Sequence, residues 1–213
     1  MLNNTYYVIS AVTIAALVYS VLRYNVFGGV PWEQLPLYIV NKAVSFSGII
    51  LLTLSIILNK RSESGSKLLA ILKDSKSAFA GIGFLYIFVH VLLSLILLNP
   101  LNYIKLYDAA GMFNLAGGIS LTAGALTFAA FAEIFYSIES ESCRRAGLRA
   151  FVFSMPVKAA VTLLLLTHLF CMGFQGWLAP DKWPGGLPPI TLISFVIYLT
   201  GVIVNLKLNR NRL

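Results

Sequence analysis

The chain has 213 residues, of which 58% are hydrophobic and only 11% are charged, and its formal net charge is +8. Soluble domains carry about 25% charged residues, so this composition excludes an ordinary soluble enzyme and indicates an integral membrane protein. We interpret the positive charge as a signal of membrane orientation and expect a lipid bilayer, not nucleic acid, as the partner.

Six apolar stretches reach the roughly 20 residues that a helix needs to cross a bilayer. In chain order they cover about residues 5–24, 37–58, 77–98, 112–137, 152–174 and 188–206. We therefore predict an all-α fold in which residues 1–213 form a single bundle of six transmembrane helices. The first stretch has no basic residue before it and no clear cleavage site, so we expect a retained helix instead of a signal peptide.

Lysine and arginine gather in alternate connections between these stretches. Because cytoplasmic loops carry the excess of basic residues, we expect segments 59–77 and 138–158 and the C-terminal tail in the cytoplasm. With six spans, both termini then lie inside, and we expect the plasma (inner) membrane of a bacterium. The basic residues of these segments are Lys60, Arg61, Lys67, Lys73, Lys76, Arg144, Arg145, Arg149, Lys158, Lys207, Arg210 and Arg212.

The only two histidines, His90 and His168, lie inside the third and fifth stretches. An ionisable group is costly within a bilayer, and imidazole is a common ligand of haem iron. The two stretches run in the same direction, and at about 1.5 Å per residue each histidine lies some 18–20 Å from the cytoplasmic edge. This matching depth predicts one haem b near the outer face, with both histidines as iron ligands.

Three further residues are candidates for this haem site. Gly83 lies two helical turns before His90, on the same face, where a missing side chain would admit a flat macrocycle. Arg23 and Lys42, near the outer ends of the first two spans, would pair with the anionic propionates. Two other interpretations stay open. Gly83 is also typical of close helix packing, and Arg23 and Lys42 are also typical of long basic side chains that extend to the lipid headgroups.

The chain contains no nucleotide-binding motif and no cysteine or histidine spacing typical of a metal site. Cys143 and Cys171 are far apart, so we expect no disulfide framework. Electrons would therefore come from a quinol or from a separate flavoprotein, with quinone or flavin as a partner's cofactor.

The stretch FLYIFVHVLLS over residues 84–94, and LPLYIVNK over residues 35–42, resemble helix three and the start of helix two of ferric reductase-like transmembrane domains. That superfamily includes NADPH oxidases, metalloreductases and the haem subunit of the periplasmic methionine sulfoxide reductase system. The resemblance implies six spans with both termini inside and haem ligands on helices three and five.

The chain departs from the two-haem members of this superfamily. Those carry a second histidine about 13 or 14 positions earlier, roughly four helical turns, on each ligand helix. Here the equivalent positions hold Met155 and either Lys76 or Ser77, so we predict a single haem. Met155 is either a packing residue or a thioether ligand, and Glu133 is a proton relay, an ion-pair partner or a solvated carboxylate.

We therefore expect a membrane electron-transfer protein, the membrane subunit of an oxidoreductase system. It would pass single electrons to a ferric chelate, to oxygen or to an extracytoplasmic redox partner. Two alternatives stay open: a small transporter or channel with the histidines in its pathway, and a haem-free scaffold or assembly subunit with the same helices. We find no Gly/Pro-broken repeat of the kind that transporters often show.

Overall fold

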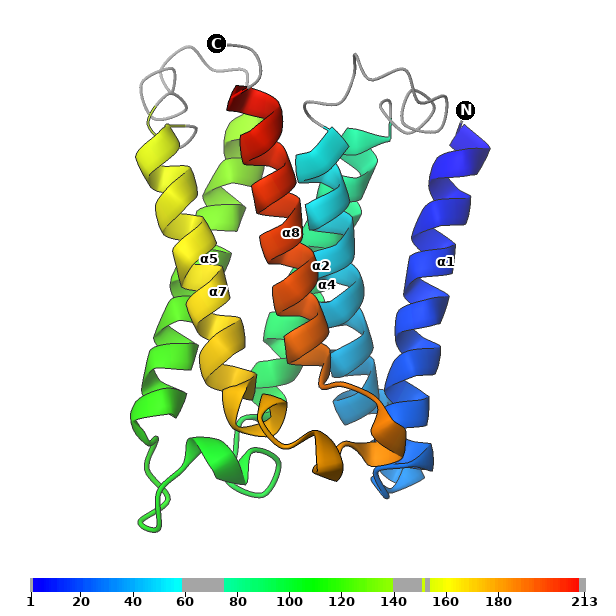
Figure 1. The fold of residues 1–213 in the computed structure, drawn as a ribbon, viewed down its shortest axis with the longest axis vertical. Coiled ribbons are helices and arrows are strands. Elements are labelled where there is room, and N and C mark those ends of the chain that lie inside the picture. Colours follow the sequence, from blue (N-terminus) through cyan, green and yellow to red (C-terminus); the bar gives the residue numbers. More distant parts are fainter. Residues whose placement is uncertain (1, 59–74, 140–150, 152–153, 211–213) are drawn as a thin grey trace. The chain divides into compact units, whose positions relative to one another are not determined.

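The computed structural model describes residues 2–58, 75–139, 151 and 154–210. This part of the chain is helical and contains no β-strand, apart from one isolated bridge between Tyr107 and Phe113. The predicted all-α class is confirmed. The long helices (Figure 1) are α1 (Leu2–Ser20), α2 (Val40–Leu58), α4 (Lys76–Leu97), α5 (Leu115–Glu139), α7 (Met155–Trp177) and α8 (Ile190–Arg210).

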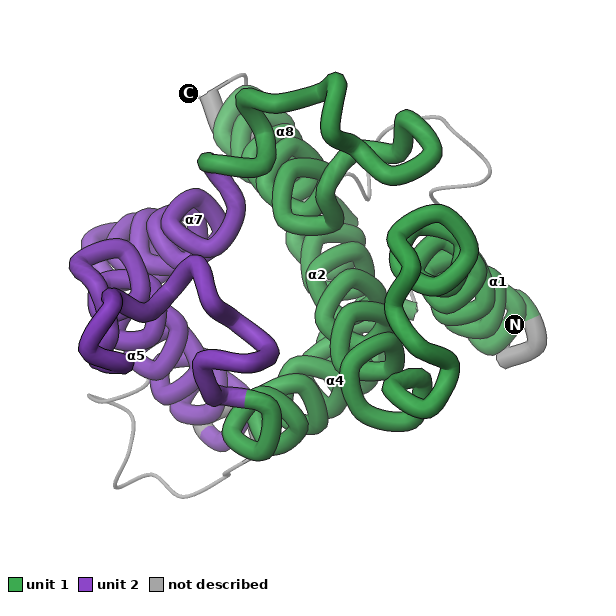
Figure 2. The backbone as a smooth tube through the Cα atoms, turned by 90° about the horizontal axis from the view of Figure 1, so that it is seen from below, with its two compact units in different colours: residues 1–97, 175–213 green, residues 98–174 purple. Residues whose placement is uncertain are grey.

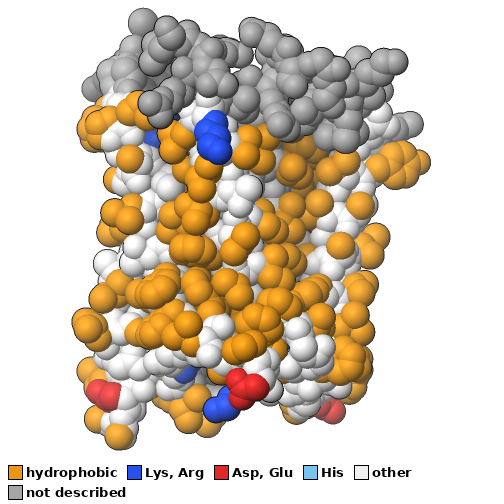
Figure 3. Space-filling view, viewed as in Figure 1, with side chains coloured by type: hydrophobic (Ala, Val, Ile, Leu, Met, Phe, Trp, Pro, Cys, Tyr) orange, Lys and Arg blue, Asp and Glu red, His pale blue; other side chains and the backbone are white. Residues whose placement is uncertain are grey.

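Six helical stretches of the described chain are long and apolar enough to cross a membrane, with mean hydropathies from 1.6 to 2.3. They are Asn4–Val26, Trp32–Leu58, Lys76–Leu97, Leu115–Tyr136, Met155–Trp177 and Pro184–Lys207. Each overlaps one predicted span, which confirms the expected six helices. On the face drawn in Figure 3, hydrophobic side chains cover the middle of the helices, and charged side chains appear only near helix ends.

The second span begins several residues earlier than the sequence suggested. Two short helices, η2 (Trp32–Gln34) and η3 (Leu35–Ile39), lead directly into α2. Pro36 lies in the first turn of η3, where a proline costs little because the first N–H groups of a helix have no partner within it. A comparable π-helical turn, η1 (Val21–Val26), extends α1.

The chain divides into two compact units (Figure 2). Unit 1 comprises residues 1–97 and 175–213 and contains α1, α2, α4 and α8; unit 2 comprises residues 98–174 and contains α5 and most of α7. The expected single domain over residues 1–213 stays a prediction.

Within unit 1, α2 is the central helix and packs against α1, α4 and α8. Its span is 56% buried, whereas those of α1, α4 and α8 are between 17% and 22% buried. Polar bonds also join the helices: Thr13 Oγ1 lies 2.9 Å from the Tyr86 hydroxyl, and Asn205 Nδ2 donates to Ile56 O at 2.8 Å. The apolar residues at the centre of these contacts are Ile9, Ala16, Phe46, Leu51, Leu58, Phe79 and Ile190.

In unit 1, α1 and α4 run in one direction and α2 and α8 in the other (Figure 1). The start of α1 and the end of α8 therefore lie at the same end of the unit. The opposite end, here called the turn end, holds residues 21–39 and the segment 184–189 that leads into α8.

In unit 2, a loop over residues 98–114 precedes α5 and includes the short helix η4 (Ile104–Leu106). Leu106 is buried, and its carbonyl oxygen lies so close to Gly117 that an added Cβ there would meet it at 2.3 Å. The ammonium group of Lys105 donates a hydrogen bond to Met172 O on α7. The loop is thereby attached to both helices of the unit.

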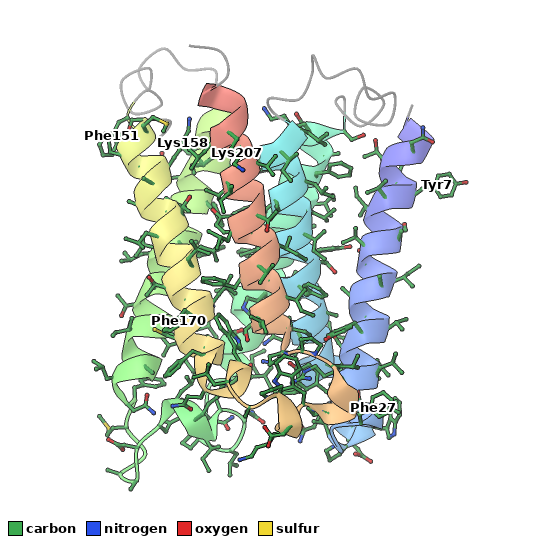
Figure 4. All side chains as sticks on the ribbon, in the orientation of Figure 1. Tyr7, Phe27, Phe151, Lys158, Phe170 and Lys207 are labelled. Atoms are coloured by element: carbon green, nitrogen blue, oxygen red, sulfur yellow. The ribbon has the colours of Figure 1, made fainter. Side chains whose placement is uncertain are left out.

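Most of the basic residues that predict the membrane orientation lie outside the described residues. Lys76 begins α4 and Arg210 ends α8. Lys158 lies in the first turn of α7, and Lys207 lies near the end of α8 (Figure 4). The orientation of the termini stays a prediction. The undescribed basic residues are Lys60, Arg61, Lys67, Lys73, Arg144, Arg145, Arg149 and Arg212.

Candidate functional site

His90 lies on α4 in unit 1, in the part of the helix nearer the turn end. It comes fourteen residues after Lys76, the first residue of α4, and seven before Leu97, the last. The side chain is half-buried. An imidazole is therefore held well inside a membrane-spanning helix, as predicted.

The imidazole of His90 belongs to a cluster of three polar side chains. His90 Nδ1 lies 2.6 Å from Asn41 Oδ1, and Asn41 Nδ2 donates to Ser94 Oγ at 3.1 Å. Ser94 Oγ is also 3.3 Å from His90 Nδ1. Ser94 follows His90 by one helical turn and so shares its face of α4, while Asn41 lies in the first turn of the antiparallel α2.

This cluster determines which ring nitrogen of His90 carries the proton. An amide oxygen can only accept a hydrogen bond, so the Nδ1–H of His90 donates to Asn41 Oδ1. In a neutral imidazole the lone pair is then on Nε2. Metal-ligating histidines commonly donate their other ring N–H to an oxygen in this way.

His168 lies on α7 in unit 2, thirteen residues after Met155, and has the same arrangement with different partners. Its Nδ1 lies 2.8 Å from the backbone oxygen of Ser120 on α5 and 3.1 Å from Ser120 Oγ. Ser120 is fully buried, and its hydroxyl also donates to His168 O at 3.3 Å. Because a carbonyl oxygen only accepts, His168 too is protonated at Nδ1.

A glycine allows His168 to approach α5 this closely. A Cβ added at Gly124, one turn after Ser120, would lie 2.7 Å from His168 Nδ1. Real Cβ atoms do not come so near another heavy atom, so any larger residue at this position would displace the imidazole. Gly124, a small residue of the kind that usually serves helix packing, therefore also positions a histidine.

His90 belongs to unit 1 and His168 to unit 2. Their pairing on one iron stays a prediction. The described part of the chain contains no group of three or more histidine, cysteine, aspartate or glutamate side chains suited to a metal ion. Haem iron needs only two axial ligands from the protein, so two histidines suffice for it.

Gly83 is buried, and its described neighbour is on α2. A Cβ added there would lie 3.0 Å from Leu52 Cγ and 3.1 Å from Leu52 N. A Cβ added at Gly48, on α2, would lie 3.1 Å from Gly83 O. The two glycines therefore allow α2 and α4 to pack closely, as small residues do in membrane helices. That Gly83 also admits a macrocycle stays a prediction.

Arg23 lies in η1 and is only 7% exposed. Its guanidinium donates through Nη1 to Leu187 O, in the segment before α8, and lies 5.5 Å from the centroid of the Tyr24 ring. Its Nε is buried without a hydrogen-bond partner among the described residues. Arg23 therefore attaches segment 184–189 to the end of α1, and its predicted pairing with a propionate stays a prediction.

Lys42 follows Asn41 in the first turn of α2 and is half-buried. Its Nζ lies 4.9 Å from the centroid of the Tyr38 ring, a cation–π distance. Met155, the first residue of α7, is 62% exposed, and Glu133 is half-buried near the end of α5. The propionate, thioether and proton-relay roles of these residues stay predictions.

Sequence reasoning did not identify the residues that hold the two imidazoles. Asn41 enters the expectations only as part of the stretch LPLYIVNK, and Gly124 and Ser120 are not among the predicted site residues. Only the contact with Ser94 was predictable from the sequence, because Ser94 lies four residues after His90 and therefore on the same helical face.

No protein-family model matches the chain, and a comparison with curated proteins finds no match. The resemblance to ferric reductase-like domains therefore stays an expectation.

Proposed function

We propose that this protein is a membrane haem b protein that transfers single electrons, with His90 and His168 as the two axial ligands of one haem. One observation carries the proposal: both histidines lie in membrane-spanning helices, and each donates its Nδ1–H to an oxygen of its own unit. Both imidazoles therefore have the tautomer that ligates a metal through Nε2.

The protein's part in such a site is to hold the two imidazoles and to keep water away. Asn41 and the backbone of Ser120 fix the orientation of the rings, and both residues are fully buried. The apolar helices provide a low-dielectric surrounding, which together with the axial ligands sets the potential of a haem. When bound, the haem iron supplies reversible one-electron chemistry.

The proposed arrangement has both termini in the cytoplasm of a bacterium and the haem nearer the outer face. Support comes from the basic residues of the cytoplasmic segments and from the position of His90, which is closer to the turn end of α4 than to its start. The electrons come from a quinol or a separate flavoprotein and pass to an acceptor outside. One haem is the limit for bis-histidine ligation, because the chain has two histidines.

The test is the optical spectrum of the protein purified from cells with an ample haem supply. We expect a reduced b-type spectrum and one haem per chain, and we expect His90→Ala and His168→Ala each to abolish it. Met155→Ala is the matched control, because Met155 is the other candidate axial ligand and its exposed side chain leaves no cavity. A colourless wild-type protein would overturn the proposal.

The cluster of His90, Asn41 and Ser94 also supports a second candidate, a haem-free scaffold or assembly subunit. A histidine with such hydrogen bonds is a satisfied polar group even without a metal. Under this alternative the protein is colourless, and it keeps its cellular role after both histidines are replaced by asparagine.

A further inference from the structure

Asn41, in the first turn of α2, is an unusual residue for the interior of unit 1, because its side chain is fully buried in an apolar helix bundle. A buried amide without hydrogen bonds costs free energy, roughly 1–3 kcal/mol in proteins. Both ends of this amide are bonded: Oδ1 to His90 Nδ1 at 2.6 Å and Nδ2 to Ser94 Oγ at 3.1 Å. The amide of Asn41 therefore has hydrogen bonds to both His90 and Ser94.

In the observed orientation, the Asn41 amide points Nδ2 toward the hydroxyl of Ser94 and Oδ1 toward the imidazole of His90. Because Oδ1 can only accept, an unprotonated Nδ1 at 2.6 Å would place two lone pairs against each other, whereas Nδ1–H makes a hydrogen bond. Asn41 therefore selects the Nδ1-protonated tautomer of His90.

We propose that Asn41 is the positioning residue of His90: it fixes the tautomer of the imidazole and thereby increases the electron donation of Nε2 to iron. A ligand that donates its second N–H to an oxygen is a more basic ligand. Such a ligand stabilises Fe(III) relative to Fe(II) and lowers the reduction potential. The effect on iron rests on the proposed haem function, whereas the effect on the tautomer does not.

The two histidines differ in the kind of acceptor they use. The acceptor of His168 is the backbone carbonyl of Ser120, which a substitution of Ser120 itself does not remove. The acceptor of His90 is a side chain. A substitution of Asn41 therefore removes the acceptor of His90 and leaves the acceptor of His168 unchanged.

The first test uses the haem-free protein and the ¹⁵N NMR signals of its two histidines. In the wild type we expect both imidazoles to be protonated at Nδ1. In Asn41→Leu we expect the tautomer ratio of His90 to shift toward Nε2–H by roughly tenfold, the value of one hydrogen bond, while His168 stays unchanged as an internal reference. An unchanged His90 ratio would overturn the proposal.

The second test is a redox titration of the protein loaded with haem b. In Asn41→Leu we expect the equilibrium to shift tenfold toward Fe(II), which raises the one-electron potential by about 59 mV. Asn41→Asp keeps an oxygen against His90, so its potential should lie at or below that of the wild type. If Asn41 had only a structural role, the two substitutions would not be expected to move the reduction potential in opposite directions.

Asn205→Leu is the matched control, because Asn205 joins α8 to α2 through Ile56 O and belongs to the same unit. We expect it to change neither the tautomer of His90 nor the potential. If Asn41→Leu does not fold, Asn41→Asp decides: a potential above that of the wild type overturns the proposal. If the wild type binds no haem, the proposed function fails, and the NMR result still decides the role of Asn41.

Discussion

Gly124 of α5 and His168 of α7 approach so closely that a Cβ on the glycine would lie 2.7 Å from the Nδ1 atom of the imidazole. The hydrogen bond from His168 to the backbone of Ser120 requires this approach. His168 can therefore donate its Nδ1–H to α5 only because Gly124 has no side chain.

Gly124→Ala should therefore displace His168 and break its bond to Ser120. We expect the free energy of unfolding to fall by about 1–3 kcal/mol, the usual cost of inserting a methyl group into a packed site. The midpoint of thermal unfolding in detergent measures the change. In the haem-loaded protein, the same variant should lose haem more readily than the wild type.

Gly118→Ala is the control for this substitution, since Gly118 lies on the same helix and an added Cβ there meets nothing within 4 Å. Its stability should stay unchanged or rise by up to about 1 kcal/mol, because alanine is the better helix former. Equal destabilisation by the two variants would contradict a specific contact between Gly124 and His168.

Gly83→Ala tests the contact between α4 and α2. An added Cβ would lie 3.1 Å from the backbone nitrogen of Leu52, which cannot move without shifting α2. We expect a loss of about 1–3 kcal/mol that is already present in the haem-free protein. Ser77→Ala, an exposed change on the same helix, should stay within about 0.5 kcal/mol. A Gly83 variant with full stability but weaker haem binding would favour the role in admitting a macrocycle.

The six helices were predictable because the bilayer imposes both their length and their composition. The start of α4 at Lys76 lies one residue from its predicted position, and that of α7 at Met155 lies three away. The larger difference is at the second span, which was expected from residue 37 and begins at Trp32, with Pro36 in the first turn of η3.

The partners of the histidines were not predictable from the same pattern. They depend on how each helix is rotated about its axis, and residues as small as Gly124 decide this. Asn41 lies 49 positions from His90 in the chain. The partner of His168 is a backbone carbonyl, a group that every residue has and that no sequence motif marks.

Arg23→Met should loosen the segment that leads into α8. The variant loses the charged hydrogen bond to Leu187 O, a type of bond that contributes roughly 1.5–3 kcal/mol. We expect faster hydrogen exchange at the amides of Gly186 and Leu187, measured by mass spectrometry. The neighbouring bond from the Tyr19 hydroxyl to Pro188 O, at 2.6 Å, should limit the opening to this segment.

Lys182→Met is the matched control, because Lys182 is an exposed cation shortly before the same segment. It should leave the exchange unchanged. The ring of Phe27 lies against Gly185 at the same turn end (Figure 4) and should keep this position in both variants. Unchanged exchange in Arg23→Met, together with a lower haem content, would favour the predicted pairing of Arg23 with a propionate.

The membrane orientation can be tested with single cysteines at the two ends of the last span. Lys182 and Lys207 are exposed and lie before and near the end of α8, respectively. In a background with Cys143→Ser and Cys171→Ser, a membrane-impermeant maleimide should label Lys182→Cys in intact cells. It should label Lys207→Cys only after the membrane is permeabilised, because the basic C-terminal tail is expected inside. The opposite pattern would place the turn end of unit 1, and with it His90, near the cytoplasmic face, and electrons from a cytoplasmic flavoprotein would then have a short path to the haem.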